Sequence, residues 1–366
     1  MPEVTLRAIA VDAMGGDKGP AAVVEGVCMA LRKNEAIKIV LVGQREVLEP
    51  LLSKAGIEND PRLSLLHAGE VIGMDEKPIK SIRQKKDSSL VRAIDLVKDG
   101  TCKAAVSCGN TGSLMAGGTL KLRMMTGVER PALAAVWPSR EQHFVMLDVG
   151  ANPSTKPEHF VHNAILGSHF CRLTLGREKP RVGLLSIGTE ESKGHEGIQS
   201  ANEKLHAIGE IINYVGPIEG FDIFENKVDV VVCDGFTGNV LLKTSESLFK
   251  TFRSIMKDMI LKSPIRILGA LLLKGVFKDL KKKMDPDRYC GAPLLGLQGN
   301  VIKAHGSASS VAIASAIRIA GEFIEYDMTT HVAEDIAKAN LILSECKTKE
   351  FAARISAATS SSVSEE

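Results

Sequence analysis

Six short polar clusters, each with at least one glycine, follow apolar segments of this chain. In an open α/β sheet, ligands bind outside the carboxyl ends of the strands, where loops pass into helices. Glycine lets backbone N–H groups come close to an anion, and a helix N-terminus favours negative charge. If the six clusters lie along one edge of a sheet, they predict a site for a small oxyanion, with phosphate as the leading choice. The clusters span residues 12–17, 107–112, 148–152, 186–194, 234–239 and 303–307.

Three side chains in these clusters are candidate catalytic residues. Lys193 directly precedes Gly194, where a helix is expected to begin, so its charge would add to the positive end of the helix dipole. Asn239 can donate an amide hydrogen bond to an oxyanion, and His305 can serve as a base or as a phosphate ligand. The ordinary alternatives are that Lys193 is a solvated surface lysine and that His305 has a structural role.

Binding of the substrate or of phosphate is assigned to other polar and glycine positions of the clusters. Asp12 and Asp17 would repel a pyrophosphate, and the turn between them matches neither GxGxxG nor GxxxxGK[ST], so a dinucleotide is not expected. The ordinary role of such aspartates is to cap the next helix. The assigned binding residues are Asp12, Gly15, Gly16, Asn110, Thr111, Gly112, Ser113, Asn152, Gly194, Asp234, Thr237, Gly238, Gly306 and Ser307.

Two cysteines, Cys108 and Cys233, border glycine clusters, so covalent catalysis by a thiolate has to be weighed. Both follow apolar strand-like segments, which favours small buried side chains over nucleophiles. The histidines mostly stand apart in the sequence, and there is no GxSxG motif. We expect neither a metal nor any other cofactor.

Composition excludes several classes of protein. The chain has 366 residues, of which 44% are hydrophobic and 25% charged, enough for a globular core. A net charge of +2 and an aromatic content of 4% argue against a nucleic-acid partner. There is no signal-peptide pattern and no run of ~18 uncharged apolar residues. The seven scattered cysteines, without a CxxC pair, suit reduced thiols in a cytoplasmic protein.

Apolar segments alternate with helical patterns along most of the chain, which indicates an α/β fold with a mostly parallel sheet. Residues 1–350 are expected to form one large unit, and the serine-rich residues 356–366 a disordered tail. The expected strands are 7–11, 38–42, 64–67, 104–107, 133–136, 144–148, 181–186, 212–215 and 228–233, and the expected helices include 19–33, 45–55, 88–98, 157–175, 194–205 and 307–323.

Residues 241–284 break this alternation and predict a protruding hairpin of two amphipathic helices with basic flanks. One interpretation is that the helices pack on each other or across a dimer interface, the commoner fate of such faces. The other is that they dock on a membrane surface or on a partner protein. The residue pattern favours both equally. The residues assigned to this role are Arg266, Leu271, Leu272, Lys274, Phe277 and Lys278.

Over about residues 7 to 325 the chain resembles the bacterial phosphate acyltransferase family (PlsX). The likeness rests on motifs that follow one another in order and are together highly specific. One departure is Ala308, which stands where the family pattern suggests a second serine. The motifs are residues 10–17, 76–78, 85–89, 107–112, 129–132, 148–152, 187–194, 234–239 and 291–296.

The resemblance implies transfer of a fatty acyl group from acyl carrier protein to inorganic phosphate, which gives acyl phosphate for phospholipid synthesis. It also implies a three-layer α/β/α fold like that of isocitrate and isopropylmalate dehydrogenases, and a homodimer. It further implies peripheral association with the inner face of the cell membrane and a downstream glycerol-3-phosphate acyltransferase. By the same resemblance, Lys193 and Asn239 stabilise the oxyanion and phosphate, with Asn110, Asp234 and His305 in support.

Two other functions stay open. One is a phosphotransacetylase that acts on acyl-CoA. The other is an NAD-dependent dehydrogenase of the same fold, which would need an aspartate cluster for a divalent metal and a cofactor-reading loop, and neither is evident. The long amphipathic hairpin, which suits a membrane-bound product, favours the acyl carrier protein reaction over the phosphotransacetylase.

Overall fold

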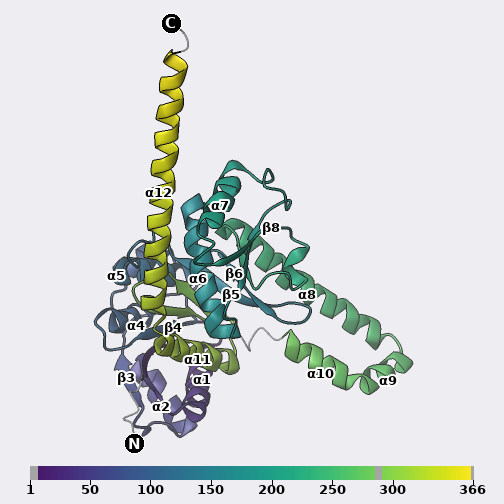
Figure 1. The fold of residues 1–366 in the computed structure, drawn as a ribbon. Helices are drawn as coiled ribbons and strands as arrows, with labels where there is room; N and C mark the ends of the chain where they lie inside the picture. The colour runs from purple at the N-terminus through teal and green to yellow at the C-terminus, as the bar shows by residue number, and fades with distance from the viewer. Residues whose placement is uncertain (1–6, 285–290, 364–366) are drawn as a thin grey trace, which may run out of the picture.

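The computed structural model describes residues 7–284 and 291–363, and Figure 1 labels many of its elements. The strands are β1 (Arg7–Asp12), β2 (Ile37–Gly43), β3 (Leu63–His67), β4 (Ala104–Ser107), β5 (Ala132–Pro138), β6 (His143–Leu147), β7 (Arg181–Leu185), β8 (Asn213–Ile218), β9 (Val230–Val232), β10 (Ala292–Leu295) and β11 (Asn300–Lys303). The helices are α1 (Gly19–Lys33), α2 (Arg45–Ala55), α3 (Pro78–Gln84), α4 (Ser89–Lys98), α5 (Thr111–Leu122), α6 (Pro157–Leu175), α7 (Glu196–Ala207), α8 (Gly235–Leu261), α9 (Pro264–Leu272), α10 (Lys274–Lys283), α11 (Ser310–Tyr326) and α12 (Met328–Val363), with a short 3-10 helix at Asp222–Phe224.

The strands form one sheet in the order β3-β2-β1-β4-β11-β10-β5-β6-β9-β7-β8. Neighbouring strands are parallel from β3 to β11 and again from β6 to β8. They are antiparallel at the three central pairings, β11 with β10, β10 with β5, and β5 with β6. The predicted α/β fold with a mostly parallel sheet is therefore confirmed.

Helices cover both faces of the sheet, because alternate residues of each strand face opposite sides. On β1, Ile9 and Val11 pack with residues of α1 and α11, whereas Ala10 packs toward α4. On β6, Val145 belongs to the core shared with α6, and Phe144 faces the core that the first turns of α8 cover. The two faces give the three α/β/α layers that Figure 1 shows.

The strand and helix predictions miss α3, α5, α12, β10 and β11. Helix α5 is rich in glycine, which weakens a helical pattern. Its glycines are needed for packing: a Cβ on Gly117 would lie 2.7 Å from Ile94, and one on Gly118 would lie 2.8 Å from Leu297. Strands β10 and β11 have four residues each, too few for a readable period, and their pairing with neighbouring strands defines them.

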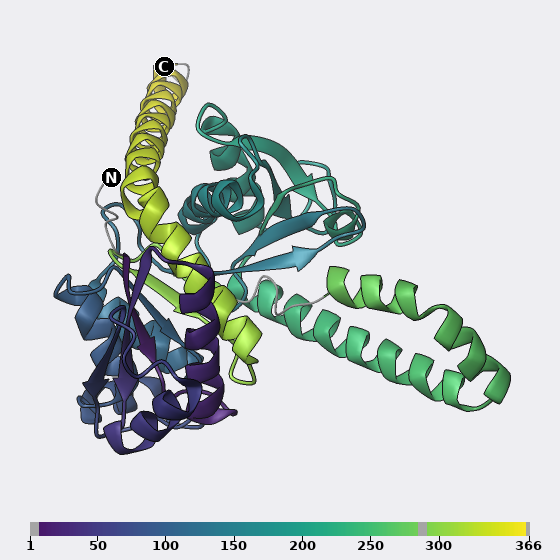
Figure 2. The ribbon, with the colours of Figure 1, turned by 90° about the horizontal axis from the view of Figure 1, so that it is seen from below.

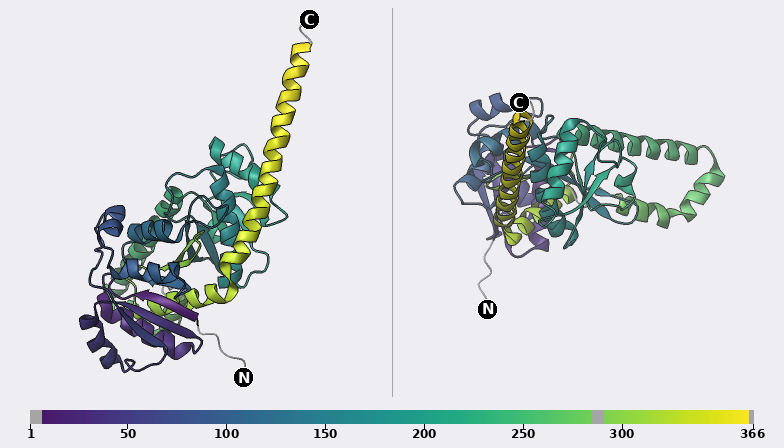
Figure 3. Two further views of the ribbon diagram at one scale, coloured as in Figure 1. Left: turned by 90° about the vertical axis from the view of Figure 1, so that its left-hand side faces the viewer. Right: turned by 45° about the horizontal axis from the view of Figure 1, so that its top comes forward.

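Two helical segments extend away from the sheet (Figures 2 and 3). Helices α8, α9 and α10 occupy the region of the predicted hairpin, with α8 beginning already at Gly235 and the second arm divided at Leu273. Helix α12 continues to Val363, so 356–363 are helical where composition predicts disorder, and 364–366 lie outside the described residues. Because its first turns are anchored by packing, extending the helix costs little.

Candidate active site

The six predicted loops form two groups, and the expectation that all of them share one edge of the sheet is wrong. The first loop group follows β1, β4 and β11, and the second loop group follows β6, β7 and β9. Because three antiparallel pairings separate β11 from β6, the two sets of strands run in opposite directions. The prediction failed because sequence patterns do not reveal the direction in which each strand runs in the sheet. With its terminal strand residues, the first group comprises 12–18, 107–110 and 303–309, and the second 148–156, 186–195 and 233–234.

Hydrogen bonds between loops hold the first loop group together. The buried Asp12 accepts a hydrogen bond from Ser107 Oγ through its Oδ2 atom at 2.6 Å. Gly109 N in turn donates to Ser107 Oγ at 3.0 Å, and Asp17 N donates to Gly306 O at 2.7 Å. Three loops that are far apart in sequence are thus fixed against one another, and Asp12 serves this closure.

Glycines that sequence assigns to anion binding are required by contacts between backbones. A Cβ on Gly15 would lie 2.6 Å from a backbone nitrogen of the β4 loop. Gly16 has φ of +94°, and a Cβ there would lie 2.9 Å from Gly306 O. At the start of α8, which follows the second group, a Cβ on Gly238 would lie 1.9 Å from Asp148 O. These positions let loops pack closely, whatever they contribute to a ligand.

The β6 loop of the second group is organised around Asp148, which is fully buried. Its carboxylate accepts hydrogen bonds from the N–H groups of Gly150, Ala151 and Asn152 at 3.0, 2.8 and 2.8 Å. Burial raises the pKa of Asp148, although these hydrogen bonds oppose the shift. Asn152 Nδ2 donates to Pro131 O at 2.6 Å and to Asp148 at 2.9 Å. The amide of Asn152 is therefore engaged within the loop.

Polar residues at the starts of α5 and α8 cap these helices. Asn110 Oδ1 accepts from Ser113 N at 2.9 Å, while Asn110 Nδ2 donates to two backbone carbonyls of residues 74–76. Asp234 accepts from Thr237 N at 2.8 Å and from Thr237 Oγ1 at 2.7 Å. The Asn110 amide, predicted to donate to the anion, has both its hydrogens committed, and we assign these four residues to positioning.

Helix α8 connects the two loop groups. It begins in the second group, and its Asn239 and Lys243 are exposed and one turn apart, so they lie on the same face. The charged neighbours of His305, in the first group, include Lys243 and Glu246 of α8. The face of α8 that carries Asn239 and Lys243 therefore looks toward the His305 loop.

The hydrogen bonds of His305 fix its tautomer. Its Nδ1 atom accepts from Ser307 N at 3.2 Å and lies 2.8 Å from Ser307 Oγ. In the neutral ring the proton then resides on Nε2. Partial burial lowers the pKa of His305, and the positive charges of Lys243 and Lys303 lower it further, against the opposite effect of Glu246 and Asp17. At neutral pH this ring is uncharged and has an N–H group to donate.

Lys193 lies in an exposed turn before α7. The helix predicted from Gly194 begins at Glu196, and the side chain of His195 caps it by accepting from the N–H two residues later at 3.1 Å. Gly194 instead turns the chain, with φ of +86°. Since β7 lies beside β9 in the sheet and runs parallel to it, the Lys193 loop and the start of α8 share an edge.

Neither cysteine is placed for nucleophilic attack. Cys108 and Cys233 are buried, which confirms their interpretation as small core side chains. Burial raises the pKa of the Cys233 thiol well above its ordinary value, so little thiolate forms at neutral pH. Among the residues that the structure describes, no group of three or more His, Cys, Asp or Glu side chains is arranged to hold a metal ion.

One buried charged residue of the first loop group is not singled out by sequence reasoning. Lys303 is only 7% exposed, although lysine is almost never fully buried without partners. The signal that could have found it is a lysine that closes a short apolar strand, β11, and is the first residue of a glycine-bearing cluster.

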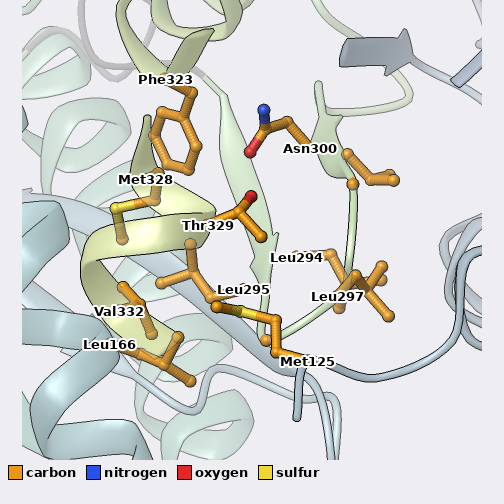
Figure 4. Close-up of a pocket in the computed structure, with 13 residues that line it drawn as sticks. Met125, Leu166, Leu294, Leu295, Leu297, Asn300, Phe323, Met328, Thr329 and Val332 are labelled. Atoms are coloured by element: carbon orange, nitrogen blue, oxygen red, sulfur yellow. The ribbon is translucent and has the colours of Figure 1, made fainter. Parts of the chain in front are cut away.

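Figure 4 shows a pocket away from the first loop group. It lies at the amino end of β11, beside Asn300, whereas His305 follows the carboxyl end of that strand. Its lining contains no ionisable side chain and is mostly apolar. It offers no charge to an anion, and we do not include it in the candidate site.

Comparison with known proteins decides the family. A sequence model of the family described as "Fatty acid synthesis protein" matches residues 7–331. A phosphate acyltransferase of Nitratidesulfovibrio vulgaris is 44% identical over 328 residues, covering 90% of this chain and 94% of that protein. A phosphate acyltransferase of Alcanivorax borkumensis is 46% identical over 320 residues, covering 87% and 94%. The chain belongs to the phosphate acyltransferase family. It is therefore an enzyme.

This member of the phosphate acyltransferase family is also similar in fold to solved structures. A phosphotransacetylase from Streptococcus pyogenes has a TM-score of 0.59 at 15% identity, covering 91% of this chain and 96% of that one. A branched-chain phosphotransacylase from Enterococcus faecalis has a TM-score of 0.52 at 13% identity, covering 87% and 100%. At such identities the likeness concerns the fold alone.

Proposed function

We propose that this enzyme transfers a fatty acyl group from acyl carrier protein to inorganic phosphate and releases acyl phosphate for phospholipid synthesis. One observation carries the proposal: relatives named phosphate acyltransferase are 44% identical over nine-tenths of the chain. The buried cysteines support it as well, because phosphate can itself be the nucleophile and the protein then needs no covalent intermediate.

In the proposed reaction a phosphate oxygen attacks the thioester carbonyl, and the carbonyl oxygen becomes an oxyanion. When the tetrahedral intermediate collapses, the carbon–sulfur bond breaks and the carrier leaves as a thiolate. Lys193 and Asn239 are exposed donors suited to the oxyanion and the phosphate. The neutral His305 donates from Nε2 to a phosphate oxygen, and the closed first loop group orients the nucleophile.

The deciding experiment compares two acyl donors in the presence of a chelator. Purified enzyme is given phosphate with either acyl carrier protein or coenzyme A as the palmitoyl thioester, and acyl phosphate is trapped with hydroxylamine. We expect product from the carrier protein thioester with the larger kcat/KM. A larger value with coenzyme A would make the enzyme a phosphotransacetylase, and no acyl phosphate from either donor would remove the proposed function.

The same proposal includes a homodimer in the cytoplasm, bound peripherally to the inner face of the cell membrane, where the downstream glycerol-3-phosphate acyltransferase takes the product. Among the described residues, no helix has the length and apolarity needed to cross a membrane. Helix α9 has no buried residue, and the consecutive Leu271, Leu272 and Leu273 are 63%, 81% and 52% exposed. Lys274 and Lys278, both exposed, follow in α10, and such apolar and basic surfaces suit an anionic membrane.

Replacing Leu271 and Leu272 with glutamate tests the hairpin. The variant should no longer bind vesicles that contain phosphatidylglycerol, because apolar insertion is lost and the two negative glutamates are repelled by the anionic surface. Acyl transfer in solution and the dimer, measured by sedimentation, should stay unchanged. The control is Lys282→Ala, which removes one charge and should weaken vesicle binding by only ~1 kcal/mol. Dissociation of the dimer with vesicle binding retained would instead identify the hairpin as interface.

A further inference from the structure

Three buried polar residues form a row across the carboxyl ends of β1, β4 and β11. Asp12 is the register partner of Ser107, and Ser107 is the register partner of Lys303. Their exposed fractions are 2%, 2% and 7%. Register partners in parallel strands point to the same face, ~4.8 Å apart from strand to strand. The side chains of an aspartate, a serine and a lysine therefore lie side by side underneath the first loop group.

The row lies on the α4 side of the sheet. The preceding residue of each strand, Val11, Val106 and Ile302, belongs to the core on the opposite face. Ala10 and Ala105, two positions back from the row on β1 and β4, pack with α4 instead. The polar row is consequently not part of the main core, and its members reach toward the loops above the sheet.

Lys303 joins two loops of the first group. Its Nζ atom donates to Cys108 O in the β4 loop at 3.2 Å and also to Ala304 O in its own loop. Carbonyl oxygens are the kind of acceptor that a buried ammonium needs. These bonds fix the position of the charge, so it does not have to be ordered when an anion arrives.

The charge of Lys303 acts on the exposed part of the site. Two residues further on stands His305, and the pKa of His305 is lowered in part by Lys303. Lys243, the other cation that lowers the pKa of His305, is an exposed residue of α8. The two cations differ in screening: salt weakens the field of an exposed charge much more than that of a buried one.

We propose that Lys303 is the fixed cation of the phosphate site, a positioning residue that holds the His305 loop and attracts the phosphate dianion through its buried charge. It does so without contacting the ligand, which meets His305 and the backbone N–H groups of the loops. The inference rests on the proposed function in one respect, namely that the anion is phosphate.

The test measures binding of inorganic phosphate by calorimetry to the wild-type protein, Lys303→Gln and Lys303→Arg. Glutamine keeps a donor for the two carbonyls but removes the charge, whereas arginine keeps the charge. We expect Lys303→Gln to weaken phosphate binding roughly 10- to 100-fold, because one nearby and weakly screened charge is lost. Lys303→Arg should retain most of the phosphate affinity. Lys303→Met repeats the neutral measurement if the glutamine variant does not fold.

Lys243→Gln is the matched control. Its effect on phosphate binding should shrink between 50 mM and 500 mM salt, while the effect of Lys303→Gln should persist. As a readout that a merely structural lysine would not move, the pKa of His305, followed by NMR, should rise in Lys303→Gln because a neighbouring positive charge is removed.

The outcomes separate this inference from the proposed function. Unchanged phosphate affinity in a folded neutral variant overturns the role of Lys303, even if the enzyme makes acyl phosphate. Equal losses in the Gln and Arg variants also overturn it, because the hydrogen bonds would then matter and the charge would not. Charge-dependent phosphate binding without acyl transfer would keep the fixed cation and remove the proposed reaction.

Discussion

The two loop groups are built differently, although both follow parallel strands and both are rich in glycine. In the first, Asp12, Ser107 and Lys303 are buried and bonded to neighbouring loops, and the exposed residues are Asp17, Lys18, His305 and Ser307. In the second, buried Asp148 organises the β6 loop, whereas Lys193 and, in the helix α8 that follows the group, Asn239 are exposed. The first group is therefore suited to a fixed anion, and the second to donors that meet charge developing during reaction.

The largest expected effect is loss of turnover in the second group. Lys193→Ala and Asn239→Ala should each lower kcat by ~10²–10³, the usual result of removing one oxyanion donor. Both side chains are exposed, so the free energy of unfolding should not change. Lys179→Ala, at another exposed lysine, in the loop before β7, is the control in steady-state assays. Wild-type turnover in either variant would remove that residue from the mechanism.

A smaller effect, on stability, should come from the closed first group. Gly15→Ala places a methyl group 2.6 Å from a backbone nitrogen and should cost about 1–3 kcal/mol in urea unfolding. Gly269→Ala in α9 meets nothing within 4 Å and should stabilise its helix by about 0.5–1 kcal/mol. Equal stability of the two variants would mean that the loops of the first group are not closed as described.

The smallest effect concerns two asparagines near the starts of helices: Asn110 is the N-cap of α5, and Asn239 lies within the first turns of α8. Asn110→Ala loses the cap of α5 and should cost ~1 kcal/mol of unfolding free energy, with much less effect on turnover than Asn239→Ala. Urea unfolding and kcat for both variants give the comparison. If Asn110→Ala instead loses turnover at unchanged stability, its amide is rearranged toward the ligand and the contrast between the groups fails.

Much of the local structure is predictable from sequence. Helices α1, α2 and α6 match their predicted bounds, because each combines an apolar stripe with a proline start or a glycine end. The six loops are recognisable because glycine and polar residues interrupt apolar strands. Glycine-rich α5 and the four-residue β10 and β11 are not, since packing of Gly117 and Gly118 and pairing with neighbouring strands define them.

Sequence by itself determined the α/β class, the family and the positions of Lys193 and His305 in loops, because these follow from local composition and ordered motifs. The tertiary structure decided how the loops divide, since strand direction depends on pairings between residues far apart in the chain. It also decided that Asn110 caps a helix and that Lys303 is buried. Partners of a side chain and its distance from water are properties of the packed chain, and no local pattern encodes them.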